Sequence, residues 1–248
     1  MKILACYSNK GGVGKTAAAV NVAYGLRRAG KRVLLCDLDP QGASSFYFRV
    51  KPSKKLKDAR FFFDVARFTR AIRGSDFEDL DILPANMTFR NFDVFLSRMK
   101  NSRSRLQKAL KKVGNEYDVV VLDCPPNISS LSENVFKASD AILVPIIPTT
   151  LSERTFEQLI EFFDEHDLPK KKILGFFSMA QASKKLHVGT IDKMKADHGK
   201  RLLDVAVPFA TDVEKMGVHR APVATFAGSR PAAAAYDALC RDVLERLG

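Results

Sequence analysis

A glycine-rich run near the start of the chain has the residue types and spacing of a phosphate-binding loop. It reads Asn9-Lys10-Gly11-Gly12-Val13-Gly14-Lys15-Thr16 and separates an apolar stretch from an alanine-rich one. Its glycines let successive backbone N–H groups turn inward toward phosphate oxygens, and a following helix adds its positive N-terminus. Lys15 then reaches the β- and γ-phosphates of a nucleotide, and the Thr16 hydroxyl ligates a magnesium ion. The residues expected around the phosphates are Gly11, Gly12, Val13, Gly14, Lys15, Thr16 and Ala17.

The loop departs from the usual GxxxxGK[ST] pattern at its start. Asn9 stands where the first glycine belongs, and Lys10 adds a second lysine. A second cation near the γ-phosphoryl group can stabilise the charge that spreads over its oxygens. We therefore regard Lys10, together with Lys15, as a candidate catalytic residue.

Carboxylates end two other apolar runs. Asp37 and Asp39 follow the run VLLC, and Asp123 ends the run VVVLD. A carboxylate beside the phosphates can orient the attacking water or the waters around magnesium. We assign Asp39 to catalysis and, with Thr16 and Asp123, to the metal site, where Asp123 holds magnesium through a bound water. Asp37 is either a further carboxylate of this kind, or a cap at the end of its strand or a partner that supports the site residues.

Alternating strands and helices must position these residues. Apolar runs predict strands at Lys2–Ser8, Arg32–Asp37, Leu80–Pro84, Tyr117–Asp123, Ala141–Pro145, Ile173–Met179 and Leu203–Pro208. Helical patterns lie at Lys15–Ala29, Phe92–Lys112, Ser129–Ala138, Ser152–His166, Val188–His198 and Arg230–Leu247. This order predicts one α/β domain over residues 1–248, with a mostly parallel twisted sheet and helices on both faces. The candidate residues then share the carboxyl edge of the sheet, and Tyr47–Ser75 is an insertion on the same domain.

The composition favours a polyanionic partner. Forty basic and 28 acidic residues give a net charge of +12, which divides into +6 over residues 1–50, +9 over 51–112 and −3 over 113–248. Such a basic surface attracts nucleic acid phosphates. No apolar run approaches the roughly 18–20 residues of a membrane span, and the start of the chain lacks a signal-peptide pattern, so we expect a cytoplasmic protein. The four cysteines form no CxxC pair and are expected to be buried.

Three motifs together are similar to those of the ParA/MinD family of deviant-Walker P-loop ATPases. They are KGGVGKT at 10–16, CDLDPQGAS at 36–44 and VVVLDCPP at 119–126, and the second is typical of the ParA side. The resemblance covers essentially the whole chain. It implies a P-loop fold and the cofactors ATP and Mg²⁺. It also implies that Asp39 positions the hydrolytic water, and that Lys10 reaches the partner's phosphates in an ATP-dependent homodimer.

The resemblance also implies the other partners. Family members bind double-stranded DNA of any sequence and hydrolyse ATP slowly until a small activating adaptor or a centromere-binding protein stimulates them. They position a plasmid, a chromosome or a protein organelle, so we expect nucleoid association and no membrane contact. The DNA-binding candidates are Lys184, Lys185, Lys215 and Arg220. Because Asp212 stands about where relatives carry a basic residue, the DNA contacts are expected to have shifted toward Lys184 and Lys185 or the basic run 51–73.

In this family the base pocket lies between the ends of the later strands. The corresponding candidates are Met179, which follows one apolar run, and Pro208 with Phe209, which follow the next. Gln181 is a candidate hydrogen-bond donor to the base.

Two other functions stay open. A MinD-like membrane-cycling regulator needs a C-terminal amphipathic helix with a basic rim, whereas YDALCRDVLERLG at 236–248 carries three acidic residues and looks like a packed final helix. A metabolic enzyme or iron–sulfur carrier that uses the same phosphate loop does not need Lys10 or the excess of basic residues. A carrier also needs paired cysteines.

Overall fold

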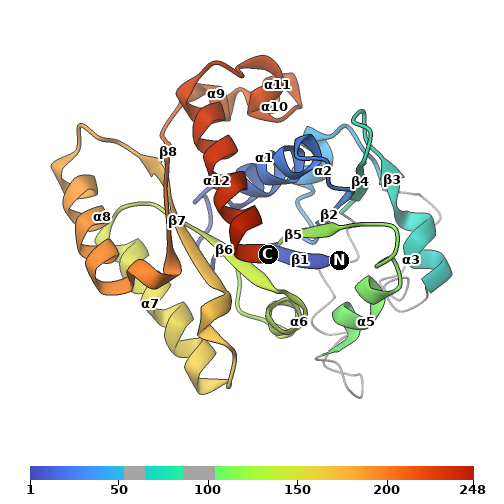
Figure 1. Ribbon diagram of the computed structural model, residues 1–248, viewed down its shortest axis with the longest axis horizontal. Coiled ribbons are helices and arrows are strands. Elements are labelled where there is room, and N and C mark those ends of the chain that lie inside the picture. Colours follow the sequence, from blue (N-terminus) through green and yellow to red (C-terminus); the bar gives the residue numbers. More distant parts are fainter. Residues whose placement is uncertain (53–64, 86–103) are drawn as a thin grey trace.

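The computed structural model describes residues 1–52, 65–85 and 104–248. Within these ranges the chain forms an eight-stranded sheet in the order β3-β4-β2-β5-β1-β6-β7-β8 (Figure 1). Neighbouring strands run parallel except β3 and β4. The strands are β1 (Lys2–Cys6), β2 (Val33–Asp37), β3 (Arg73–Gly74), β4 (Leu80–Leu83), β5 (Val119–Asp123), β6 (Ala141–Ile146), β7 (Ile173–Ala180) and β8 (Leu202–Pro208). All seven predicted strands are present, and the predicted mostly parallel sheet is confirmed.

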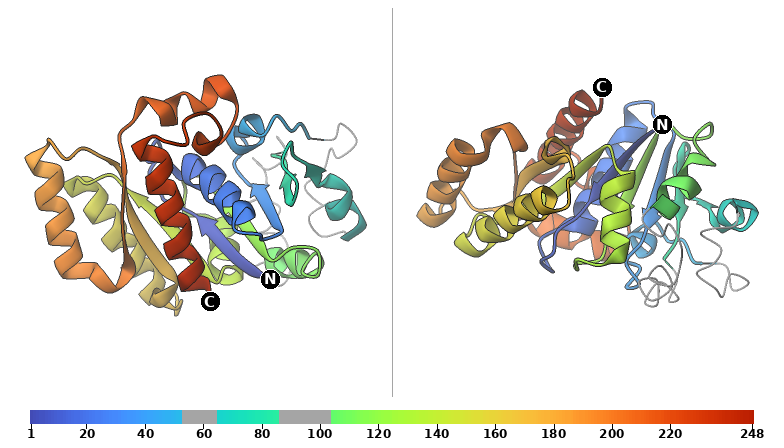
Figure 2. Two further views of the ribbon diagram at one scale, coloured as in Figure 1. Left: turned by 45° about the horizontal axis from the view of Figure 1, so that its top comes forward. Right: turned by 90° about the horizontal axis from the view of Figure 1, so that it is seen from below.

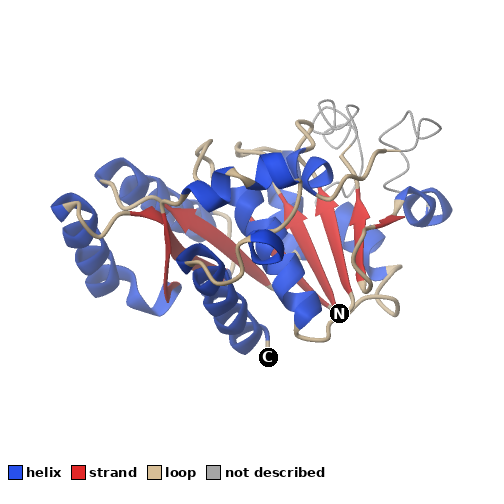
Figure 3. Ribbon diagram, turned by 90° about the horizontal axis from the view of Figure 1, so that it is seen from above, coloured by secondary structure: helices blue, strands red, loops and turns tan. Residues whose placement is uncertain are grey.

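The centre of the sheet brings the candidate residues together. β1 lies between β5 and β6, and β2 lies on the other side of β5. Because these strands are parallel, they end at the same edge of the sheet, where their arrowheads point in Figure 3. The register pairs Asp123 with Cys6 on one side and with Asp37 on the other. The loop that follows β1 therefore lies directly beside these two carboxylates.

Helices cover both faces of the sheet. One face carries α1 (Lys15–Arg28) and α12 (Pro231–Leu247), which pack side by side (Figure 2). The other face carries α5 (Arg105–Lys111), α6 (Ser130–Ala138), α7 (Thr150–Glu165) and α8 (Lys185–His198). Successive residues of β5 alternate between the two cores: Val120 and Leu122 enter one, while Val119 and Val121 enter the other. Burial on both faces explains why the strands read as continuous apolar runs.

Several short helices were not expected from the sequence. They are α2 (Ala43–Tyr47), α3 (Val65–Ala71), α9 (Thr211–Glu214), α10 (Met216–His219) and α11 (Val223–Phe226), with single 3₁₀ turns at Lys170–Lys172 and Gly199–Arg201. Helices of four to seven residues are too short to show a period of 3.6 in sequence. Residues 53–64 of the expected insertion, and residues 92–103 of the helix expected at Phe92–Lys112, lie outside the described residues.

Candidate nucleotide site

The glycine-rich loop connects β1 to α1, as predicted. Gly12 and Gly14 have φ angles of 72° and 95°, in the left-handed region that favours glycine. A Cβ on Gly14 would lie 2.8 Å from the Ser178 hydroxyl oxygen of β7, so this position also lacks the space for a side chain. A Cβ on Gly11 or Gly12 would meet no atom within 4 Å, and both residues are exposed. The loop therefore presents an open backbone surface at the N-terminus of α1, which suits an anion.

Lys15 is held inside this loop. It is only 7% exposed, and its ammonium donates a hydrogen bond to the Lys10 carbonyl at 2.9 Å. Burial lowers the pKa of Lys15, while the nearby negative charges of Asp123 and Asp39 oppose that shift. A cation is thus positioned beside two carboxylates at the exposed glycine surface. Anionic phosphate oxygens fit this arrangement because they add negative charge next to a partly desolvated ammonium.

Asp123 has one carboxylate oxygen anchored and one free. The Ser44 hydroxyl donates to Asp123 Oδ2 at 2.6 Å, whereas Oδ1 is buried and has no hydrogen-bond partner among the described residues. Burial raises the pKa of Asp123 to about 6, although hydrogen bonds from Ser44 and Thr16 lower it. An unpartnered buried carboxylate oxygen beside a threonine hydroxyl suits a hydrated divalent cation. The residues present therefore fit the predicted magnesium ion.

Asp37 is fully buried and serves as a cap for α2. Its Oδ2 accepts hydrogen bonds from the Ser45 backbone N–H at 2.8 Å and from the Ser45 hydroxyl at 2.6 Å. Burial, with the neighbouring Asp123 charge, raises the pKa of Asp37 to about 7. Of the roles left open for Asp37, the contacts match the cap at the end of its strand.

Asp39 lies in the turn between β2 and α2. Its carboxylate accepts a hydrogen bond from the Gln41 N–H at 2.9 Å, and its carbonyl accepts one from the Gly42 N–H at 2.9 Å. The described residues contain no group of three or more His, Cys, Asp or Glu side chains that could hold a metal without a substrate. A magnesium site that uses one or two carboxylates and completes its shell with phosphates and water needs no such group.

The three predicted base-pocket residues do come together. Met179, Pro208 and Phe209 line a depression of about 410 Å³ whose other wall includes Gly14 and Ala17 of the phosphate loop. Pro208 ends β8, and the Phe209 N–H donates to the Ala180 carbonyl at 3.0 Å, which holds the ends of the last two strands together. The depression therefore continues from the phosphate loop to the apolar side chains of Met179, Pro208 and Phe209, which suit a nucleotide base.

Sequence reasoning missed several residues at the site. The most important are Ser44 and Ser45, which anchor the two buried carboxylates from α2. Their signal was the pair of serines that follows the DLDPQG motif after one alanine, near a predicted strand end. Val213, Glu214 and Tyr236 also line the base depression, and nothing in the sequence singled them out.

Lys10 lies at the opposite rim of the loop. Its ammonium is 3.4 Å from the Ser152 hydroxyl at the start of α7, and both residues line a second, smaller hollow of about 270 Å³. Lys10 is half-buried and makes no contact with the carboxylates in the described part of the chain. Its side chain therefore reaches toward the start of α7.

The DNA-binding candidates lie apart from the phosphate loop. Lys184 and Lys185 are exposed at the start of α8, and Lys215 is exposed between α9 and α10. Arg220 is half-buried, and its Nε donates to the Phe46 carbonyl at 3.1 Å. The three lysines are therefore free to meet a polyanion, whereas the Arg220 guanidinium already has a partner within the chain.

Comparison with known proteins identifies a family. A family model described as an AAA domain matches residues 1–175. The chain belongs to this family. The sporulation initiation inhibitor protein Soj of Bacillus subtilis is 28% identical to it over 98% of both chains. The chromosome partitioning protein ParA of Myxococcus xanthus is 26% identical over 97% of this chain and 87% of its own. These relatives confirm the resemblance to the ParA/MinD family.

Solved structures confirm the P-loop ATPase fold. Cobyrinic acid a,c-diamide synthase from Mycobacterium smegmatis, with a bound ATP analogue and magnesium, has a TM-score of 0.80 and 24% identity, over 99% of this chain and 95% of that one. The ATP complex of a Cyanothece McdA variant has a TM-score of 0.83 and 17% identity, over 99% and 96%. At these identities the likeness establishes the fold alone. The ligands of these neighbours agree with the predicted cofactors, ATP and Mg²⁺.

Proposed function

We propose that this protein is a ParA-like partitioning ATPase: it binds ATP with Mg²⁺, dimerises, binds DNA without sequence preference, and is reset by hydrolysis. The observation that carries the proposal is the placement of Lys15. Its buried ammonium lies beside Asp123 and Asp39 at an exposed glycine loop. The family, and relatives named for chromosome partitioning, support the same function.

Each residue of the site has a proposed task in hydrolysis. The backbone N–H groups of the loop and the Lys15 ammonium bind the phosphates and stabilise the charge that develops on the γ-phosphoryl oxygens. Thr16 and Asp123 hold the magnesium ion, which neutralises phosphate charge when bound. Asp39 orients the attacking water and accepts its hydrogen bond. The end of β5, the start of α1 and the turn after β2 fix these groups, so little reorganisation is needed at the moment of reaction.

Lys10 supports a dimeric active form. Among the described residues, its ammonium has one hydrogen-bond contact, to Ser152 at 3.4 Å. A long flexible cation at the rim can cross to the phosphates of a facing protomer. Two such lysines oppose the negative charge of two nucleotides buried at one interface. ATP, with its extra phosphate, therefore favours the dimer more than ADP does.

Exposed lysines support non-specific DNA binding by that dimer. Lys184, Lys185 and Lys215 supply charges to backbone phosphates, which carry no sequence information. Asp212 stands about where the family resemblance implies a basic residue. Its carboxylate lies 3.9 Å from the Arg230 guanidinium and partly neutralises the positive charge near α9. The lysines at the start of α8 therefore carry more of the proposed interaction than α9 does. A centromere-binding protein or small adaptor then stimulates hydrolysis and links the switch to its cargo.

The membrane-cycling alternative has less support. In the described part of the chain, no helix has the length and apolar character to cross a bilayer. The apolar face of α12 is buried in the core through Tyr236, Leu239 and Val243, so it is not free to insert into a lipid surface without unpacking.

The test is ATP binding and hydrolysis by the wild-type protein and two variants. Lys15→Ala should abolish ATP binding in an equilibrium titration, because it removes the cation that faces the phosphates. Asp39→Ala should still bind ATP but hydrolyse it slowly, because it removes only the group that orients water. Lys31→Ala is the control, since Lys31 is exposed and distant from the loop. Near-native ATP affinity of the Lys15 variant would contradict the assignment.

A further inference from the structure

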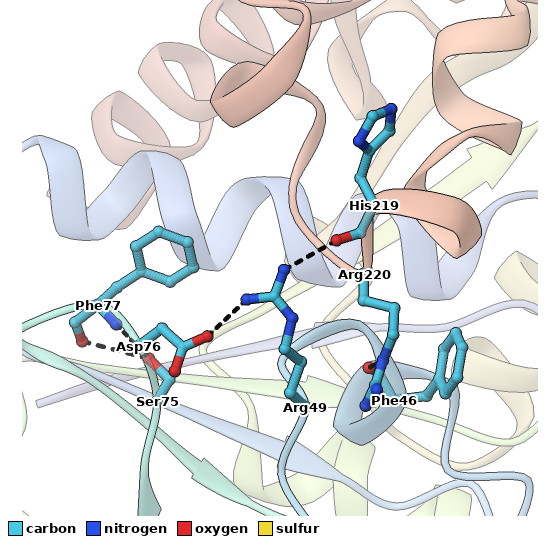
Figure 4. Close-up of polar contacts among 7 residues, drawn as sticks. All are labelled: Phe46, Arg49, Ser75, Asp76, Phe77, His219 and Arg220. Carbon is cyan, nitrogen blue, oxygen red and sulfur yellow. Dashed lines mark hydrogen bonds and ion pairs between the residues drawn. The ribbon is translucent and has the colours of Figure 1, made fainter.

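Two arginines connect short helices that come from opposite ends of the chain. Arg49 follows α2, and its guanidinium donates to the carbonyl of His219, the last residue of α10, at 2.9 Å. Arg220 follows α10, and its Nε donates to the carbonyl of Phe46 in α2 at 3.1 Å. Arg49 thus caps α10, and Arg220 caps α2 (Figure 4).

Further contacts fix both guanidinium groups. Arg49 also pairs with Asp76, in the turn before β4, at 2.7 Å, and the Arg220 guanidinium lies over the Phe46 ring at 4.6 Å (Figure 4). Both arginines have left-handed backbones, with φ angles of 57° and 49°. That conformation ends each helix at these points and directs the following chain away.

The two helices connect to different parts of the nucleotide site. From α2, Ser44 donates to Asp123 and Ser45 to Asp37, so α2 orients both buried carboxylates. The segment before α10 contains Val213 and Glu214, which line the base depression. Neither helix is long enough to be stable alone. Their mutual position therefore depends on contacts such as those of the two arginines.

We propose that Arg49 and Arg220 are positioning residues that couple the base pocket to the magnesium carboxylate, by holding α2 and α10 as one unit. The inference rests on the proposed ATPase function. A base that settles between Phe209 and α9 restrains α9–α10, and the arginines transmit that restraint to α2. Ser44 then holds Asp123 in place, so occupation of the base pocket favours a correctly oriented metal site. A bare phosphate chain lacks this effect because it leaves the base pocket empty.

The first experiment uses hydrogen–deuterium exchange on the protein without nucleotide. Three amides directly after α2 are informative: those of Phe48, Arg49 and Val50, which donate to the α2 carbonyls of Ser44, Phe46 and Ser45. Arg220→Ala should speed their exchange about tenfold, in line with the loss of a charge-assisted hydrogen bond. Arg49→Ala should in turn speed exchange in residues 216–219. Arg28→Ala is the matched control: Arg28 forms a comparably exposed ion pair with Asp237 and should alter neither segment.

The crossed pattern is the decisive feature of this experiment. Faster exchange only in the segment that carries the substituted arginine would overturn the proposal, as would equal effects of Arg28→Ala. If an alanine variant is misfolded by circular dichroism, Arg220→Lys and Arg49→Lys replace it. A lysine keeps the charge and one donor but loses the planar guanidinium, so a smaller change with the same crossed pattern is expected. Exchange rates equal to those of the wild type in both segments would contradict the proposal.

The second experiment compares ADP with pyrophosphate, both with magnesium. In the wild type, ADP should protect residues 43–50 several-fold more than pyrophosphate does, because only ADP fills the base pocket. In Arg220→Ala this difference should vanish, while both ligands still protect the phosphate loop. A difference that persists in the variant would overturn the coupling. Failure of wild type to bind either ligand would instead refute the proposed function, and the exchange pattern without nucleotide would still decide whether the arginines join the two helices.

Discussion

The Ser44 hydroxyl donates a 2.6 Å hydrogen bond to Asp123 Oδ2, which joins α2 to the end of β5. Asp123 Oδ1 is buried and, within the part of the chain that the structure describes, accepts no hydrogen bond. One oxygen of the carboxylate is thus fixed by the protein, and the other is open to a further ligand. This orientation is what makes Asp123 suited to hold the water shell of a magnesium ion.

Ser44→Ala should weaken magnesium-dependent ATP hydrolysis most at low pH. The Ser44 hydrogen bond lowers the pKa of Asp123, which burial has raised to about 6. Without the hydroxyl this pKa rises further, so more Asp123 is protonated near pH 6.5 and cannot attract a cation. We expect the magnesium concentration at half-maximal activity to rise about tenfold at pH 6.5, and less at pH 8.

Ser132→Ala is a control for Ser44→Ala. Ser132 is also a buried serine, but it belongs to the cap of α6. Its loss should lower thermal stability without changing the magnesium requirement. An equal magnesium requirement for Ser44→Ala and wild type at both pH values would contradict the role given to Ser44.

Asp37→Asn should make the nucleotide-free protein more stable at alkaline pH. Burial and the neighbouring Asp123 raise the pKa of Asp37 to about 7, well above the value of about 4 in an unfolded chain. Between these values the native protein binds a proton that the unfolded chain does not. The free energy of unfolding therefore falls as pH rises through this window. At pH 8 the variant avoids the buried charge, and we expect a gain of about 1–2 kcal/mol.

Urea unfolding at pH 5 and pH 8 measures this effect. The advantage of Asp37→Asn should be largest at pH 8 and small at pH 5. Asp118→Asn should instead lower the free energy of unfolding, because hydrogen bonds from Arg32 lower the pKa of Asp118 and favour its ionised form in the native protein. The stabilising effect of Asp118 is present at neutral pH and is lost as the solution becomes strongly acidic. A lower stability of Asp37→Asn than wild type at pH 8 would show that the cap contacts outweigh the buried charge.

Lys10→Ala should retain ATP binding but lose ATP-dependent dimerisation. The Lys10 side chain touches Ser152 and not the carboxylates of its own site, so its removal leaves Lys15 and Asp123 in place. Sedimentation velocity with a slowly hydrolysed ATP analogue should show a dimer for wild type and for Lys31→Ala, and a monomer for Lys10→Ala. A stable dimer of the Lys10 variant would mean that this lysine is an ordinary surface residue.

The central part of the fold could be predicted because its strands are buried on both faces. Runs such as VVVLD and VLLCD predict strands. The parallel order of these strands then brings Asp37, Asp123 and the glycine loop to one edge of the sheet. The candidate base-pocket residues Met179, Pro208 and Phe209 lie around one depression beside the loop for the same reason. Strand ends in a parallel sheet are predictable positions.

The contacts between short helices could not be predicted. α2 and α10 have too few residues for a helical period, and their relative position depends on Arg49 and Arg220, which are 171 positions apart. Arg220 was a DNA-binding candidate because the family resemblance implies DNA contacts from basic residues in the C-terminal part of the chain. Its contact with Phe46 depends on tertiary structure alone.

The central claim is that ATP switches the protein onto DNA, and one titration tests it most directly. Binding to two unrelated duplexes is measured by mobility shift with a slowly hydrolysed ATP analogue and with ADP. We predict equal affinity for both sequences, because the lysines contact backbone phosphates. Affinity should be much tighter with the ATP analogue, because a dimer doubles the basic surface. It should also fall by orders of magnitude between about 50 and 200 mM salt if six or more phosphates are contacted. Equal binding with the ATP analogue and with ADP, or no binding to either duplex at low salt, would contradict the account.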